Sequence, residues 1–118
     1  MDNGNNEYTM SSQYKRDLRR LQQVKEYIQN NYSSNLKAAI IAKEIGLSVS
    51  TLLHLFKKYN PLTFQQYTAQ IRMKAAFEIL KRGGSVKEAM YSSGYKYRST
   101  FNKAFKKAFH VPPGYFRK

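Results

Sequence analysis

Most side chains in this sequence that can do chemistry are cationic. Lysine and arginine number 21 among 118 residues, against 7 aspartate and glutamate residues, so the formal net charge is +14 at pH 7. Solubility of a small domain requires a far smaller charge. The chemistry that such an excess supports is binding to a polyanion. Because 42% of the residues are hydrophobic and 14% are aromatic, the chain has enough apolar surface to fold, unlike a disordered basic tail.

Residues suited to catalysis or metal binding are few. The sequence has no cysteine, and its two histidines, His54 and His110, are far apart. Thiol chemistry and disulfides are therefore excluded, and no cluster of metal ligands is expected. The seven carboxylates are scattered and offer no convergent nucleophile, base and orienting group. We expect no enzyme activity, no cofactor and no bound metal.

The apolar residues occur in short runs. The longest runs have four or five residues, such as 38–42, and the first ten residues are polar. A membrane span needs about 20 apolar residues, and a signal peptide needs an apolar segment near its start. We therefore expect a cytoplasmic protein without a membrane partner.

The elements that must position the cations are predicted to be helices. Apolar residues recur at steps of three and four from Tyr14 to Tyr32, which is typical of a helix with one buried face. Residues 1–12 lack this period and are expected to be a disordered lead or a linker remnant, with one domain over 13–118. The same pattern, with turn residues between its segments, predicts an all-α fold of about seven helices, the last at 114–118.

Helix caps give the boundaries of the central helices. Gly46 is expected to end one helix, and Ser48 to cap the start of the next. Ser85, with Glu88 three residues later, forms the sequence pattern of a capping box. A long helix is expected between these segments, at about 63–82.

An internal repeat is the most informative feature. Gly46 and Gly94 are 48 residues apart, and the Phe-Lys-Lys triplets that begin at Phe56 and Phe105 are 49 apart. Each copy reads as a short helix, a glycine turn and a second helix. The apolar positions of the first copy are those that a helix-turn-helix needs, because they hold the second helix at an angle that lets its outer face enter a major groove. The two units are predicted at about 36–59 and 85–109.

Three stretches carry a resemblance to a known family. They are IAKEIGLSVSTLLHLFKKY, IRMKAAFEIL and FNKAFKKAFHVPPGYFR. Through them the chain resembles, from about Leu21 to Lys118, the DNA-binding domain of the AraC/XylS family of bacterial transcription regulators. The resemblance implies sequence-specific binding to double-stranded DNA, with recognition helices at 48–59 and 98–109. A linker helix of about 30 Å suits two recognition helices in successive major-groove segments, which repeat every ~34 Å.

On this resemblance, the recognition-helix positions that point away from the core are candidates for contact with base edges. Arg and Lys donate to guanine, Asn pairs with adenine, and a leucine contacts a thymine methyl group. The candidates are Ser50, Thr51, Leu53 and His54 in the first helix and Arg98, Ser99, Asn102 and Lys103 in the second. The candidates for phosphate contact are Lys57, Lys58, Lys96, Lys106 and Lys107.

Several residues depart from the family pattern, most of them in the second motif. Ala89 and Met90 nearly exchange a large and a small residue, and Ser93 stands where an apolar residue is usual. Tyr97 stands where Ser or Asp would cap the second recognition helix, so its first turn is expected to fray in the free protein. Pro61 and His110 replace the usual glycines after the two recognition helices.

Two other functions stay open at this point. The basic helical surface could bind an acidic protein partner, or it could bind nucleic acid without sequence preference. The ratio of specific to random DNA affinity separates these functions from a regulator, whereas salt dependence alone does not. Besides double-stranded DNA, the candidate partners are RNA polymerase and a preceding sensing or dimerising domain. The isolated domain is expected to be a monomer associated with the nucleoid.

Overall fold

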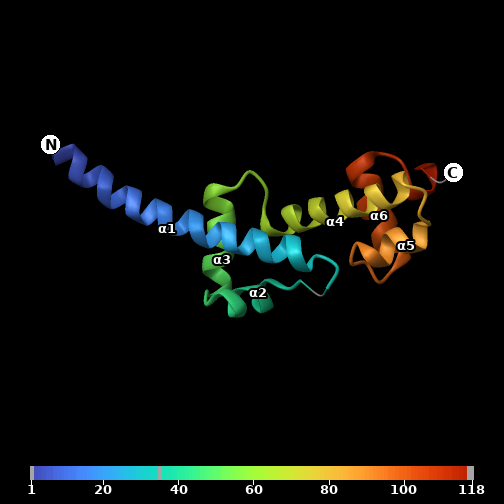
Figure 1. Cartoon of the computed structure of the whole chain (residues 1–118), viewed down its shortest axis with the longest axis horizontal. Coiled ribbons are helices and arrows are strands. Elements are labelled where there is room, and N and C mark those ends of the chain that lie inside the picture. Colours follow the sequence, from blue (N-terminus) through green and yellow to red (C-terminus); the bar gives the residue numbers. More distant parts are fainter. Residues whose placement is uncertain (1, 35, 117–118) are drawn as a thin grey trace. The chain divides into compact units, whose positions relative to one another are not determined.

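The computed structural model describes the backbone of residues 2–34 and 36–116 and the side chains of residues 12–34 and 36–116. Over this part of the chain it contains six α-helices, one 3₁₀ helix and no strand, which confirms the predicted all-helical fold (Figure 1). The helices are α1 (Asp2–Asn31), α2 (Ala38–Ile45), α3 (Val49–Tyr59), α4 (Phe64–Lys81), α5 (Val86–Ser92), α6 (Arg98–Phe109) and η1 (Pro113–Phe116).

The chain divides into two compact units, each with one helix-turn-helix pair. Unit 1 comprises residues 1–27 and 37–64, and unit 2 comprises residues 28–36 and 65–118. The pair α2 and α3 lies in unit 1, and the pair α5 and α6 lies in unit 2. Most of α1 belongs to unit 1, whereas its last residues and the loop that follows belong to unit 2.

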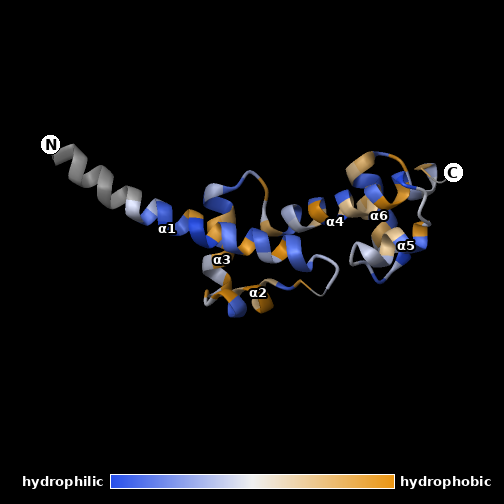
Figure 2. Ribbon diagram, viewed as in Figure 1, coloured by the Kyte–Doolittle hydropathy of each residue, from blue (hydrophilic) through white to orange (hydrophobic). Residues whose placement is uncertain are grey.

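The first helix, α1, begins at Asp2 and includes residues 2–12. Adding residues to an existing helix costs only the helix propensity of each residue, whereas nucleating a new helix is unfavourable. The expectation that this segment is a disordered lead or the remnant of a linker stays a prediction. Figure 2 shows hydrophilic and hydrophobic residues alternating along the later part of α1, as the apolar period predicts.

In unit 1, α1 is held to α3 by a polar contact. The Tyr59 hydroxyl donates to Asp17 Oδ2 at 2.8 Å, and Gln13 Nε2 donates to Asp17 Oδ1 at 2.9 Å. The hydrogen bond from Tyr59 is the main cause that lowers the pKa of the largely buried Asp17 carboxyl, against the opposing effect of burial. The Tyr14 ring packs edge-on against Tyr59, with centroids 5.7 Å apart. The buried apolar residues of unit 1 are Leu21, Val24, Ile41, Ala42, Leu52, Leu55, Phe56 and Phe64.

The core of unit 2 is rich in aromatic residues. Phe101 and Phe105 of α6 are fully buried. Phe77 of α4 packs on Phe109 and on Phe116, with centroids 5.2 Å apart in each pair. The 3₁₀ helix thus contributes Phe116 to the core, while Arg117 and Lys118, predicted to extend the final helix, lie outside the described residues. The other buried residues of this cluster are Met73, Ala76, Ile79, Leu80, Val86, Ala89 and Met90.

Candidate nucleic-acid interface

The first helix-turn-helix has the geometry that its sequence predicts. The axes of α2 and α3 bend by 97° at their turn, within the range typical of this motif. Gly46 ends α2 in the left-handed conformation, with φ of 83°, where glycine has the lowest conformational cost. The Ser48 hydroxyl accepts from the Thr51 N–H at 3.0 Å and so caps α3. Buried Leu52 and Phe56 hold one side of α3 against the core, and the opposite side is exposed.

The predicted contact residues of α3 are not equally accessible. Ser50 and His54 are exposed, and Lys57 follows them on the same outer face. Thr51 is half-buried, and its hydroxyl accepts from Ser48 Oγ at 2.8 Å. This capping role occupies Thr51 at the helix start. Lys58 is exposed, with Nζ 5.2 Å from the centre of the Tyr59 ring.

Sequence reasoning missed one residue of α3. Val49 is the first residue of the helix and is 39% exposed. Leu53, one turn later, is 37% exposed. Residues four apart lie on one helix face, so the two side chains form an apolar strip beside the polar outer face. The repeat offset of 49 residues was the signal that could have identified Val49, because it aligns Val49 with the predicted contact residue Arg98.

The second helix-turn-helix forms the same arrangement of two helices with different residues in its core. Ala89 and Met90 are both buried, so the exchange of large and small residues is accommodated in the core. Ser93 is also fully buried, and its hydroxyl donates to the Met90 carbonyl at 3.1 Å, so the polar atom is satisfied within its own helix. Ser85 caps α5 by accepting from the Glu88 N–H at 3.0 Å, as the capping box predicts. The Glu88 carboxylate lies 3.6 Å from the Arg82 guanidinium.

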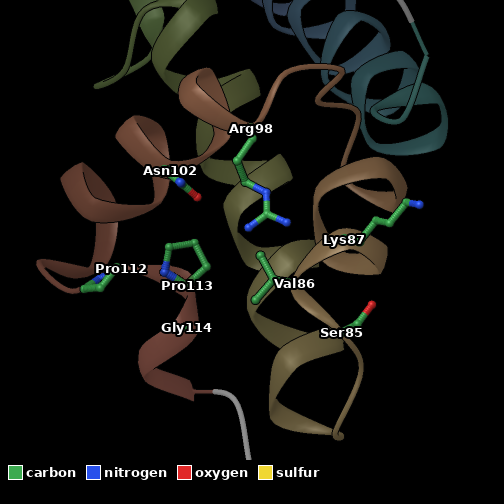
Figure 3. Close-up of a pocket in the computed structure, with 8 residues that line it drawn as sticks. All are labelled: Ser85, Val86, Lys87, Arg98, Asn102, Pro112, Pro113 and Gly114. Atoms are coloured by element: carbon green, nitrogen blue, oxygen red, sulfur yellow. The ribbon is translucent and has the colours of Figure 1, made fainter.

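The predicted contact residues of α6 fall into two pairs, all exposed. Ser99 and Lys103, four residues apart, share the outer face of the helix. Arg98 and Asn102 share its flank and line an open pocket of about 330 Å³ beside Val86 and Pro113 (Figure 3). The Arg98 side chain extends toward this pocket in Figure 3. Lys96, Lys106 and Lys107 are exposed as well.

The start of α6 has no side-chain cap. Tyr97 occupies the cap position in an extended conformation, and its side chain makes no capping hydrogen bond. This confirms the absence of a cap that the sequence predicts; the fraying of the first turn stays a prediction. No acidic residue occurs from Ala89 to the end of the chain, so no carboxylate of this segment offsets the partial positive charge of the helix start or the charge of its lysines.

The described residues contain little that indicates another kind of site. No group of three or more His, Asp or Glu side chains among them could hold a metal ion. In the same part of the chain, no single helix is long and apolar enough to span a membrane. Only α2 and α3 taken together have that length and composition, and they are bent by 97° at their turn.

Known proteins with this arrangement decide the family. A family profile described as "Helix-turn-helix domain" matches residues 41–118, which is more than half of the chain. The chain belongs to the AraC-type helix-turn-helix family. Its curated relatives are transcriptional regulators and not enzymes.

Two of these relatives of the AraC-type domain are longer proteins. The Msm operon regulatory protein of Streptococcus mutans is 38% identical over 97 residues, covering 81% of this chain and 35% of that protein. The raffinose operon transcriptional regulatory protein RafR of Pediococcus pentosaceus is 33% identical over 93 residues, covering 78% of this chain and 34% of that protein. The chain therefore spans about a third of the length of these relatives.

Solved structures of two response-regulator domains have the same fold. The C-terminal domain of the response regulator AraT from Geobacillus stearothermophilus superposes with a TM-score of 0.79 and 28% identity, covering 83% of each chain. The C-terminal domain of the response regulator yesN from Fusobacterium nucleatum gives a TM-score of 0.75 and 25% identity, covering 80% of this chain and 94% of that chain.

Proposed function

We propose that this AraC-type domain binds double-stranded DNA in a sequence-specific manner and regulates transcription. The observation that carries the proposal is the pair of recognition helices, α3 and α6, each held by a buried apolar side and each exposing polar and cationic residues on the other. Such a helix enters the major groove with its N-terminal residues at the base edges. The two helices would occupy successive major-groove segments, and α4, at 18 residues or about 27 Å, is suited to link them.

The contact residues have separate roles in this proposal. The outer and flank residues of the two helices read base edges: Ser50, Leu53, His54, Arg98, Ser99, Asn102 and Lys103, with Thr51 also capping α3. The lysines hold phosphates and set the register of the protein on the duplex: Lys57, Lys58, Lys96, Lys106 and Lys107. All of these side chains are exposed except the half-buried Thr51.

The partners and the cell location extend the proposal. The matched segment covers only about a third of each of these relatives, and two structural neighbours are C-terminal domains of response regulators. These facts support a sensing or dimerising domain that works with this one in a longer protein. Contact with RNA polymerase, a monomeric isolated domain and a place at the nucleoid in the cytoplasm are further parts of the proposal.

Selection of randomised duplex DNA by the purified domain tests the proposal. At about 150 mM salt, non-specific electrostatic attraction is already weakened, so enrichment reports base recognition. We expect two short enriched blocks about one helical turn apart. Tight binding to all duplexes without enrichment would mean non-specific binding, and absence of binding would favour an acidic protein partner.

Point variants separate base contact from phosphate contact. Ala at His54, Arg98 or Asn102 should relax the preference at particular base pairs by ~1 to 3 kcal/mol. Lys106→Ala should weaken binding to all duplexes about equally and reduce the salt slope by about 1. Uniform weakening by all four variants would contradict the proposed base-reading roles.

A further inference from the structure

The apolar strip of α3 lies where a recognition helix meets base edges. Val49 and Leu53 are in the first two turns of the helix, and each exposes more than a third of its surface. N-terminal residues of a recognition helix are the ones that reach the bases. Unit 1 leaves more than a third of each residue uncovered, although covering the rest would be favourable by the hydrophobic effect.

The second motif carries polar residues at the equivalent positions. The repeat offset of 49 residues aligns Val49 with Arg98 and Leu53 with Asn102. Both equivalents are exposed in the first two turns of α6, on one flank of the helix (Figure 3). The equivalent flanks of the two recognition helices therefore differ in chemistry: the flank of α3 is apolar, and the flank of α6 can form hydrogen bonds.

The surroundings of the strip determine which ligand fits it. Exposed Ser50, His54 and Lys57 lie next to it on α3, so the strip is a narrow apolar element inside a polar and basic face. Two side chains are too little apolar surface for a stable protein interface, which buries about 800 Å² on each partner. The occupant must be a small apolar group on a polyanion, and the thymine 5-methyl group is the apolar group in the major groove of DNA.

We propose that α3 reads thymine methyl groups through Val49 and Leu53, whereas α6 reads purine edges through Arg98 and Asn102. This inference rests on the proposed DNA-binding function and names what each motif recognises. Arg98 donates to guanine O6 and N7, and Asn102 pairs with adenine N6 and N7. The two half-sites of the operator therefore differ, one defined by thymines and the other by purines on the contacted strand.

Replacement of thymine by deoxyuridine tests the inference, because it removes only the 5-methyl group. The duplex is the one enriched by selection, with each thymine replaced in turn. Removal of a contacted methyl group should weaken binding about fourfold, the equivalent of ~0.8 kcal/mol for one buried methyl group. We expect this loss in the half-site of α3 and no loss in the half-site of α6.

A single introduced cysteine assigns each half-site to its helix. The chain has no cysteine, so an iron chelate attached to Lys43→Cys of α2 or to Tyr91→Cys of α5 cleaves DNA only beside its own motif. The two residues are 48 positions apart, like Gly46 and Gly94, both are exposed, and neither is among the proposed contact residues, so the two labels are directly comparable.

Exchange variants test the residues themselves. The measured quantity is the affinity for the thymine duplex divided by the affinity for the deoxyuridine duplex. In Leu53→Asn this affinity ratio should fall from about four toward one in the half-site of α3, with a gain of preference for adenine at that base pair. In Asn102→Leu the affinity ratio should rise above one in the half-site of α6. Ile40→Asn is the matched control, because Ile40 of α2 is 41% exposed but lies outside both recognition helices, and its ratio should match that of the unchanged protein. Thermal unfolding of each variant checks that the fold is retained.

The outcomes separate this inference from the proposed function. Selection could yield two half-sites in which deoxyuridine does not weaken binding, or weakens it equally in both. Either result would overturn the inference and leave sequence-specific binding in place. A Leu53→Asn variant that folds and keeps the full ratio would also overturn it. Absence of any enriched sequence would instead contradict the proposed function.

Discussion

Arg72 of α4 donates from Nε to the carbonyl oxygen of Tyr32 at 2.9 Å. Its Nη2 donates to the carbonyl oxygen of Ser34 at 3.0 Å, so one guanidinium holds two carbonyls of the loop between α1 and α2. The same guanidinium lies 5.6 Å from the centre of the Tyr95 ring, next to the turn of the second motif. Burial raises the pKa of the Tyr95 phenol above its usual value, and the positive charge of Arg72 opposes this rise. The loop, α4 and the second turn thus meet at one side chain within unit 2.

Removal of this guanidinium should destabilise the domain. Arg72→Ala loses two hydrogen bonds from a charged donor, and we expect the free energy of unfolding to fall by about 1.5 to 3 kcal/mol. Arg72→Lys keeps the charge but cannot donate to both carbonyls in the same geometry, so it should restore only part of the loss. Urea unfolding measures the effect, with exposed Lys74→Ala of the same helix as control. Equal effects of Arg72→Ala and Lys74→Ala would contradict the assigned role.

Gly94 should tolerate substitution less well than Gly46. Both have positive φ, +98° and +83°, so an alanine at either position is strained by about 1 to 2 kcal/mol. A Cβ at Gly94 would also lie 2.6 Å from the Tyr32 carbonyl oxygen, whereas a Cβ at Gly46 would meet nothing within 4 Å. We expect Gly94→Ala to cost about 1 to 3 kcal/mol more than Gly46→Ala, because the backbone must move to relieve the overlap. Unfolding of the two variants under the same conditions makes the comparison.

His110 is a site where the domain can be stabilised. It ends α6 in the left-handed conformation, with φ of 65°, and it is the non-glycine residue with positive φ in the described chain. Because glycine adopts this conformation without a steric penalty, we expect His110→Gly to raise the free energy of unfolding by about 1 kcal/mol. His110→Asn should have a smaller effect in the same direction. A lower melting temperature for His110→Gly would contradict the interpretation.

The Asp17 carboxyl should make stability depend on pH in the acid range. Its pKa is lower in the folded state than its ordinary value of 3.8, chiefly because it accepts the Tyr59 hydrogen bond. The stabilisation is therefore present above pH 3.8 and is lost as the pH falls through the folded pKa. Tyr59→Phe should lower stability near neutral pH, and the difference from the unchanged protein should disappear in acid. Unfolding curves over the pH range test this, and a pH-independent difference would exclude the carboxyl as its cause.

A side-chain cap should order the start of α6. Ser48 caps α3 and Ser85 caps α5, but Tyr97 makes no such bond. We expect fast amide exchange at Arg98, Ser99 and Thr100 in the free protein and slower exchange on DNA. Tyr97→Ser should slow this exchange without DNA and add about 1 kcal/mol of stability, and Ser48→Ala should cost a similar amount. Slow exchange at 98–100 in the unchanged free protein would contradict this prediction.

The frame of both motifs was predictable because its signals are local. Gly46 is a helix-stop signal and Ser48, two residues later, is an N-cap signal. The structure confirms that Gly46 ends α2 in the left-handed conformation and that Ser48 caps α3. Buried Leu52 and Phe56 follow from the helical period alone. Exposure of the predicted contact residues follows from the same period, since a residue opposite the buried side must face outward.

Other features needed the structure. Thr51 was predicted as a contact residue, and its second role in the cap is visible only from the hydrogen bond of its hydroxyl. The flank position of Arg98 and Asn102 depends on α5 and η1, which line the pocket with them. The start of α1 at Asp2 has no counterpart in the apolar period, because residues 2–12 lack one.

The sequence by itself determined that this chain is all-helical, that it carries two helix-turn-helix motifs, and that it is strongly basic. Period, caps, the repeat and net charge are properties of neighbouring residues or of composition, so they can be read without coordinates. The tertiary structure decided which distant residues meet. Arg72 and Tyr32 are 40 positions apart, and their hydrogen bond depends on how α4 packs in unit 2. Such contacts leave no local pattern, because any exposed arginine and any loop carbonyl look the same in sequence.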